Sequence, residues 1–423
     1  MKPAWYEPNL CMCNPENPNT MGMCVTLTEP VNGEALRTAV ERLRERFPYL
    51  YVRARVEGND LIAVPNPLPV TVRNTWAPIP LNSEAANYHM LALKYEGNRL
   101  CAEVCHSITD GAGFLPYLKS LLYCYLSDVT GQRFDPEGFR LPGQPIPEAE
   151  TGDPFAGLDL DAAEAPLYQK PPIADYYRFQ PSPQGGAGSF HYLRLPEAEV
   201  MRYCKDNDGS PNVLMSVLLA KAIRRMDPDS GKTVTCVVAI DHKAQAGNRQ
   251  SYRMFVDTAT VDMPAEEADC DIMKACTKAR GQLMLQAQPE NTLFTMKTRK
   301  LGYEKMEQMP LQMCVDMVKK AIAQPRATVS VSYADSRGFG PLDGYIREFY
   351  VLSEPLYVTS IMCEIACVNH GFFLALAQRS VPEAFFEAFL AELDAIGIPC
   401  DVLRSEPFHL CGVRYDGLEG VTL

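Results

Sequence analysis

The chain has 423 residues, of which 47% are hydrophobic and 22% are charged. These proportions are typical of a globular protein and unlike those of disordered, collagen-like or disulfide-scaffold chains. At roughly 150 residues per domain, the length suggests two or three domains, and we expect two, because large mixed α/β architectures can accommodate this length in two halves. The 40 basic and 52 acidic residues give a net charge of −12, and no Lys/Arg cluster offsets it. We therefore expect no binding to nucleic acid or to anionic lipid headgroups.

The cysteines and the apolar segments bear on the cellular compartment. Fifteen cysteines are scattered along the chain without a zinc-ribbon Cys-x-x-Cys pair, which favours a reducing compartment. The first ten residues are polar and contain proline, unlike a signal peptide. The apolar stretch 361–377 is broken by polar residues, whereas a membrane span needs roughly 20 nearly uninterrupted apolar residues. We therefore expect a cytoplasmic protein without a membrane span.

The first half of the chain alternates strands with helices. Leu36, Val40 and Leu43 recur at three- and four-residue steps, which predicts an amphipathic helix. Turn residues at 58–60 and 96–98 separate short apolar runs, as in β-hairpins. The expected elements are a strand at 24–28, a helix at 34–47, hairpin strands at 50–52 and 61–64, hairpin strands at 88–95 and 99–105, and a helix at 113–126.

A segment rich in proline, glycine and acidic residues runs from 139 to 188 without periodicity, and we interpret it as a crossover linker. The alternation of strands and helices then resumes, without a residue-level repeat. We therefore expect an N-terminal subdomain with the linker at 1–185 and a C-terminal subdomain at 186–423. The second half predicts strands at 190–195, 233–240, 255–261, 328–333, 346–352, 356–364 and 372–378, and helices at 196–205, 212–226, 272–286, 304–323 and 382–396.

The segment 105–111, Cys-His-Ser-Ile-Thr-Asp-Gly, is the best candidate for a functional site, because it lies between an expected strand and an expected helix. His106 can accept a proton near neutral pH, and Asp110 could brace the loop by pairing with a distant arginine. Gly111 and Gly113 lack a Cβ atom and allow close approach of a ligand or a strand. On spacing alone, a polar loop whose glycines only turn the chain is the simpler explanation.

The segment resembles the His-His-x-x-x-Asp-Gly motif of the chloramphenicol acetyltransferase-like superfamily, with Cys105 in place of the first histidine. This superfamily includes condensation domains, alcohol acetyltransferases and polyketide-associated acyltransferases. Three other segments are similar to signatures of the family: Phe47-Pro48-Tyr49-Leu50 resembles its His-Pro-x-Leu segment, Ile240-Asp241-His242 with Arg253-Met254-Phe255 resembles its strand, polar loop and Arg-Asn-Phe signature, and 332–346 resembles its late glycine-rich region.

The resemblance implies a mixed α/β fold of two chloramphenicol acetyltransferase-like subdomains. These form a V, with a tunnel between them and the motif histidine at its midpoint. It also implies an acyltransferase that moves an acyl group from a thioester to an alcohol or amine without a further cofactor. The expected co-substrate is acyl-CoA or carrier-bound acyl-pantetheine, the latter requiring a carrier protein as partner. Because no carrier domain is attached, an acyl-CoA-dependent enzyme similar to an alcohol acetyltransferase is favoured.

The resemblance also assigns roles to residues of the first half. His106 matches the second motif histidine, the general base that deprotonates the acceptor. Asp110 and Gly111 match the structural part of the motif. Asp110 is expected to pair with an arginine near the Pro-x-Leu element, which is Arg53, with Arg55 behind it.

Two polar residues of the second half are candidates for substrate binding. His242 follows a strand in the polar loop that in relatives lines the nucleophile side of the tunnel, and Ser332 opens the late glycine-rich region. We expect no metal site, because Cys101 and Cys105 are too far apart along an extended strand to join His106 in tetrahedral zinc ligation.

Two alternatives remain open. The altered motif would also suit a non-catalytic binding protein that has kept only the tunnel, although His106, Asp110 and Gly111 are all present. A thiol-dependent thioesterase would require the side chains of Cys105 and His106 to converge. Adjacent side chains of an extended strand point to opposite faces, so we expect that they do not converge.

Overall fold

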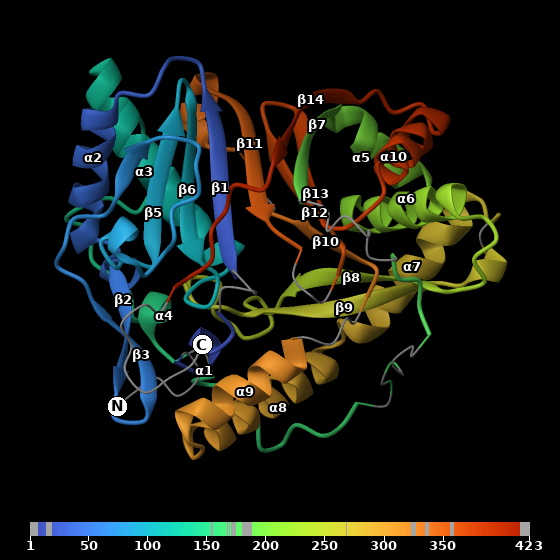
Figure 1. Ribbon diagram of the computed structural model, residues 1–423, viewed down its shortest axis with the longest axis horizontal. Helices are drawn as coiled ribbons and strands as arrows, with labels where there is room; N and C mark the ends of the chain where they lie inside the picture. Colours follow the sequence, from blue (N-terminus) through green and yellow to red (C-terminus); the bar gives the residue numbers. More distant parts are fainter. Residues whose placement is uncertain are drawn as a thin grey trace.

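The computed structural model describes residues 7–13, 19–153, 155–166, 168, 170, 175–179, 188–267, 269–322, 327–334, 338–355 and 359–414. Within these ranges the chain forms one sheet of five strands, one of seven and a separate pair of strands, with helices packed against both larger sheets (Figure 1). The mixed α/β class expected from the sequence is confirmed. Among the helices of these ranges, none has the length and hydrophobicity of a transmembrane segment.

The elements of the first half are α1 (Glu7–Leu10), β1 (Thr20–Leu27), α2 (Gly33–Arg42), β2 (Val52–Glu57), β3 (Asp60–Pro65), β4 (Val72–Asn74), β5 (Leu91–Glu96), β6 (Arg99–Cys105), α3 (Gly111–Thr130) and α4 (Glu148–Thr151). Those of the second half are β7 (Ser189–Pro196), α5 (Glu197–Asp206), α6 (Pro211–Met226), β8 (Val234–Asp241), β9 (Val256–Met263), α7 (Ile272–Gln286), α8 (Pro289–Glu307), α9 (Leu311–Ile322), β10 (Val329–Tyr333), β11 (Ile346–Ser353), β12 (Ile361–Val368), β13 (Gly371–Gln378), α10 (Glu383–Ala395) and β14 (Asp401–Pro407).

Most expected elements lie within a few residues of the observed ones, and the structure differs from the expectation in several places. The helix expected at 304–323 covers only the end of α8 and the whole of α9, because α8 ends at Glu307 and α9 begins after Pro310, whose ring cannot continue a helix. Residues 289–303 of α8 were not predicted. The strand expected at 356–364 is β12 in the structure, and its expected start at 356–358 lies outside the described residues. The sequence did not predict β14, which is largely exposed and therefore lacks apolar alternation.

The five-stranded sheet has the order β11-β1-β6-β5-β4, and α2 and α3 lie on its outer side (Figure 1). Its strand β11 comes from the second half of the chain and pairs with β1 in antiparallel register, with Met21 opposite Ser353. One strand of the first sheet therefore lies beyond the expected boundary at residue 185. The boundary itself stays a prediction.

The seven-stranded sheet has the order β14-β7-β13-β12-β10-β8-β9, with α5, α6 and α10 on its outer side (Figure 1). One hydrophobic core fills the space between this sheet and its helices, and a second extends from α2 and α3 to the region where the two sheets meet. There β11 packs against β12 and β13. Strands β8 and β9 run toward the first sheet (Figure 1), and the loop between them contacts the link between β6 and α3.

Candidate functional site

His106 lies in the short link between the end of β6 at Cys105 and the start of α3 at Gly111. Its backbone N–H donates to the carbonyl of Asn19, 2.8 Å away, which extends the pairing with β1 by one residue. Its ring Nδ1 lies 3.0 Å from the carbonyl oxygen of Thr109. A carbonyl can only accept a hydrogen bond, so Nδ1 carries the proton of the neutral ring. The Nε2 atom is therefore the basic nitrogen.

Asp110 is fully buried and binds three groups from two parts of the chain. Its Oδ1 accepts a hydrogen bond of 2.8 Å from the backbone N–H of Gly113, which caps α3. Its Oδ2 accepts one of 2.9 Å from the backbone N–H of Phe255, just before β9. Its ion pair is with Lys243, which is 2% exposed and follows β8. The carboxylate thus joins the motif to the loop between β8 and β9.

The expected pair between Asp110 and Arg53 is wrong. Arg53 lies on β2 with its guanidinium carbon 5.2 Å from the ring centre of Tyr88, and Arg55 pairs with a glutamate of the same strand. The cation that meets Asp110 is Lys243, from the other half of the chain. Its only sequence signal was its place in the polar loop after a predicted strand, directly beside His242.

Gly113, rather than Gly111, is the glycine that the packing requires. A Cβ atom on Gly113 would overlap the carbonyl of Tyr252 and lie 2.6 Å from Thr109 Oγ1, whereas one on Gly111 would meet only methionine side chains at 3.9 and 4.0 Å. We expect Gly113→Ala to lower the free energy of unfolding by about 1–3 kcal/mol, because backbone must move to admit the methyl group. The control Gly111→Ala should change it by less than about 0.5 kcal/mol in urea denaturation. Equal effects of the two substitutions would contradict this assignment.

Cys105 is packed away from solvent with other polar side chains of the first half. Its Sγ lies 3.4 Å from Cys13 Sγ, which in turn lies 3.1 Å from Ser107 Oγ. Burial, followed by the hydrogen bond with Cys13, raises the pKa of the Cys105 thiol well above its usual range. Because the thiolate is the nucleophilic form, this environment does not favour attack by Cys105. Among the described residues, no group of three or more His, Cys, Asp or Glu side chains could hold a metal ion.

His242 is buried in the loop that holds Lys243. Its Nδ1 lies 3.2 Å from the hydroxyl oxygen of Thr292 on α8, and its backbone N–H donates to the carbonyl of Phe255. Burial lowers the pKa of its ring, which favours the neutral form. These contacts place His242 beside the residues that hold Asp110, and its role in substrate binding stays a prediction.

Ser332 lies on β10, directly opposite Glu364 on the parallel strand β12. The hydroxyls of Ser332 and Ser353 form hydrogen bonds with the Glu364 carboxyl group, and Glu364 interacts electrostatically with His106. Glu364 is 5% exposed, and its Oε2 has no hydrogen-bond partner among the described residues. In the sequence, Glu364 is one of the polar residues that interrupt the apolar stretch 361–377. The signal that could have identified it is the same one, since an acid inside a buried strand is rare without a partner.

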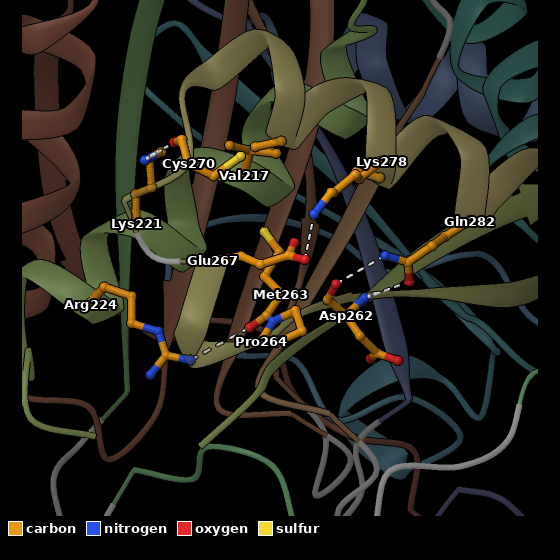
Figure 2. A pocket seen from close by; sticks show the side chains of 13 residues that line it. Val217, Lys221, Arg224, Asp262, Met263, Pro264, Glu267, Cys270, Lys278 and Gln282 are labelled. Atoms are coloured by element: carbon orange, nitrogen blue, oxygen red, sulfur yellow. Dashed lines mark hydrogen bonds and ion pairs between the residues drawn. The ribbon is translucent and has the colours of Figure 1, made fainter. Parts of the chain in front are cut away.

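A separate small pocket lies between α6, α7 and β9 (Figure 2). Its volume of about 30 Å³ holds about one water molecule. Ion pairing of Lys278 with Glu267 and hydrogen bonds between Gln282 and Asp262 cross it (Figure 2). None of the motif residues lines it, so we regard it as a small gap in the packing of α6 and α7 against β9. The tunnel expected beside His106 stays a prediction.

No protein-family model matches this chain, and no curated protein matches it in sequence. Solved structures do match. TRI101 of F. graminearum, complexed with Coenzyme A and T-2 mycotoxin, is 15% identical with a TM-score of 0.59, over 92% of this chain and 96% of that one. Polyketide synthase associated protein 5 from Mycobacterium tuberculosis is also 15% identical with a TM-score of 0.59, over 89% and 93%.

A third similar structure is the epimerization domain from the third module of tyrocidine synthetase B, at 12% identity and a TM-score of 0.51, over 92% of both chains. Each match covers nearly the whole length of this chain and of its counterpart. At such low identity these likenesses establish a shared fold.

Proposed function

We propose that this chain, which has the chloramphenicol acetyltransferase-like fold, is an acyltransferase that moves an acyl group from acyl-CoA or an acyl-pantetheine carrier to an alcohol or amine. The observation that carries the proposal is the geometry of His106. Its Nδ1 is held by the carbonyl of Thr109, which leaves Nε2 as the base at the end of β6. A side chain fixed in this way is suited to take a proton in a defined direction.

The reaction would proceed by direct attack of the acceptor on the thioester. The acceptor oxygen or nitrogen bonds to the carbonyl carbon as its proton passes to Nε2 of His106. The tetrahedral intermediate then collapses with cleavage of the carbon–sulfur bond, and the leaving thiolate takes the proton from His106. The products are an ester or amide and a free thiol, so the histidine is restored without an external proton donor.

Asp110 supports this chemistry without contacting the reacting atoms. Its carboxylate is occupied by Lys243 and by the backbone N–H groups of Gly113 and Phe255. These contacts fix the start of α3 and, through it, the loop that carries His106. Asp110 is therefore a positioning residue in this proposal.

A cytoplasmic location belongs to the same proposal, and the state of the thiols supports it. All fifteen cysteines are free, as is usual in a reducing compartment.

The proposed function is tested by a screen for thiol release from acetyl-CoA, longer acyl-CoAs and acyl-pantetheine carriers, each with a panel of alcohols and amines. We expect release that depends on the acceptor and an ester or amide product identified by mass spectrometry. Thiol release that needs no acceptor would indicate a thioesterase. If no thioester and acceptor react, the non-catalytic binding protein becomes the better explanation.

Substitution of Cys105 separates the proposed mechanism from a thiol-based one. We expect Cys105→Ala and Cys105→Ser to keep kcat within about threefold, because the buried thiol contacts Cys13 and takes no part in general-base catalysis. Mass spectrometry after incubation with acyl-CoA should find no acyl group on Cys105. Loss of turnover in Cys105→Ala together with an acyl adduct on the native thiol would instead establish covalent catalysis.

A further inference from the structure

Glu364 is a buried carboxyl group in a central strand of the second sheet. It lies on β12, which is flanked by β13 and β10, and its side chain is 5% exposed. The hydroxyls of Ser332 and Ser353 hold it from two neighbouring strands, β10 and β11. Its Oε2 atom has no hydrogen-bond partner in the described part of the chain. A buried polar atom without a partner costs about 1–3 kcal/mol of stability. The unpaired Oε2 of Glu364 therefore needs a functional or structural explanation.

Where the two sheets meet, the Glu364 carboxyl group comes close enough to His106 to interact with it electrostatically. Strand β1 pairs with β6 on one side, up to Cys105, and with β11 on the other, where Met21 lies opposite Ser353. Strand β11 in turn packs against β12. Ser353 and the end of β6 therefore lie at the same end of the first sheet. Glu364, which bonds to Ser353, interacts electrostatically with His106 across this junction.

The surroundings of Glu364 favour its neutral form. Among the described residues no Lys or Arg forms an ion pair with it, and the titratable groups that interact with it are His106 and Cys363, which precedes it on β12. Burial raises the pKa of the Glu364 carboxyl group, whereas the two serines and His106 lower it by less. A protonated carboxyl group has an O–H to donate, which an ionised one lacks.

We propose that Glu364 donates a hydrogen bond from its free carboxyl oxygen to the carbonyl oxygen of the thioester as that oxygen becomes negatively charged. This inference rests on the acyl transfer proposed above. As the acceptor bonds to the carbonyl carbon and His106 takes its proton, the carbonyl π electrons move to oxygen. Glu364 keeps its own proton throughout. When the carbon–sulfur bond breaks, the electrons return and the hydrogen bond weakens, so Glu364 acts mainly on the transition state.

Kinetics of two substitutions at one position test this role. Glu364→Ala removes the donor and should lower kcat by about 10²–10³-fold with little change in the KM of the thioester. Glu364→Gln supplies an amide N–H₂ donor of similar length, so it should keep kcat within about tenfold of the native value. If Glu364→Gln loses as much as Glu364→Ala, the group acts as a carboxylate and the inference is wrong. If neither loses kcat, Glu364 is only structural.

Glu354 provides a matched control. It is also a buried carboxyl group near the junction, at 8% exposure, but it is paired with Arg379. Glu354→Gln should leave kcat near the native value. If Glu354→Gln loses as much kcat as Glu364→Ala, the buried carboxyl groups at this junction matter only for folding. That result would overturn the inference.

A measurement that does not use turnover tests the neutral state. Because the pKa of Glu364 is raised in the folded protein, its contribution to stability is present below the unfolded pKa of about 4.3 and is lost as pH rises through the folded pKa. The native protein should therefore lose stability relative to Glu364→Gln as pH rises above about 4–5. If the stability of the native protein relative to Glu364→Gln does not change with pH, the pKa of Glu364 is not raised in the folded protein and the inference is overturned.

The two proposals fail in distinguishable ways. Transfer that depends on His106 but not on Glu364 would overturn this inference and leave the proposed function standing. Absence of His106-dependent transfer from every thioester would overturn both.

Discussion

Replacing His106 with Ala is expected to lower kcat for acyl transfer by about 10²–10⁴-fold while the KM of the thioester stays nearly unchanged. The substitution removes the Nε2 base but leaves Asp110 with Lys243, Gly113 and Phe255, so the start of α3 keeps its place. Steady-state assays of thiol release, with both substrates varied in turn, measure this effect. Added imidazole or another small base should restore part of the turnover, because it can occupy the space of the missing ring.

His370 is the matched control for this experiment. Its side chain is almost fully exposed, at 98%, in the turn between β12 and β13, so His370→Ala should leave kcat unchanged. Native turnover in His106→Ala would place the base elsewhere and refute the proposed mechanism.

Replacing Asp110 with Asn is expected to lower the free energy of unfolding by about 3–5 kcal/mol. Lys243 is 2% exposed and would keep its charge in the interior without the carboxylate that balances it. An Asn side chain can still accept one of the two backbone hydrogen bonds, so the loss should come mainly from the charge. Chemical denaturation of the native and Asp110→Asn proteins at neutral pH measures this loss of stability. Turnover should also fall, because the loop that carries His106 shifts.

A double substitution identifies the source of this loss. Asp110→Asn combined with Lys243→Met removes the unpaired charge and should recover a large part of the lost stability. The exposed pair of Arg55 and Glu57 is the comparison, since Glu57→Gln should cost less than about 1 kcal/mol. If Asp110→Asn is as stable as the native protein, the buried pair does not hold the two halves of the site together.

The fold was largely predictable because its elements have strong local patterns. The apolar steps that begin at Leu36 predicted α2, and the alternation of turns and short apolar runs predicted β5 and β6 within a few residues. The likeness in fold to solved structures confirms the two-subdomain architecture that the motif at 105–111 implied. Strand β14 escaped prediction because an exposed edge strand has little burial pattern to read.

The site was predictable only where its residues are neighbours in sequence. His106 and Asp110 belong to one short segment, which the resemblance identified. Lys243 and Glu364 join them through the pairing of strands from the other half of the chain, and no local pattern specifies that pairing. The resemblance pointed to Arg53, after the Pro-x-Leu element, as the partner of Asp110, whereas the loop after β8 supplies it.

The place of β11 in the first sheet has a consequence for synthesis of the protein. Every residue of β1 is buried, and one of its two edges is covered only by a strand that leaves the ribosome late. Until β11 emerges, the growing chain presents an unpaired apolar edge of the kind that promotes aggregation. A fragment that ends at residue 185 would retain this edge permanently. The sheet of the first half therefore cannot be completed until residues 346–353 have been synthesised.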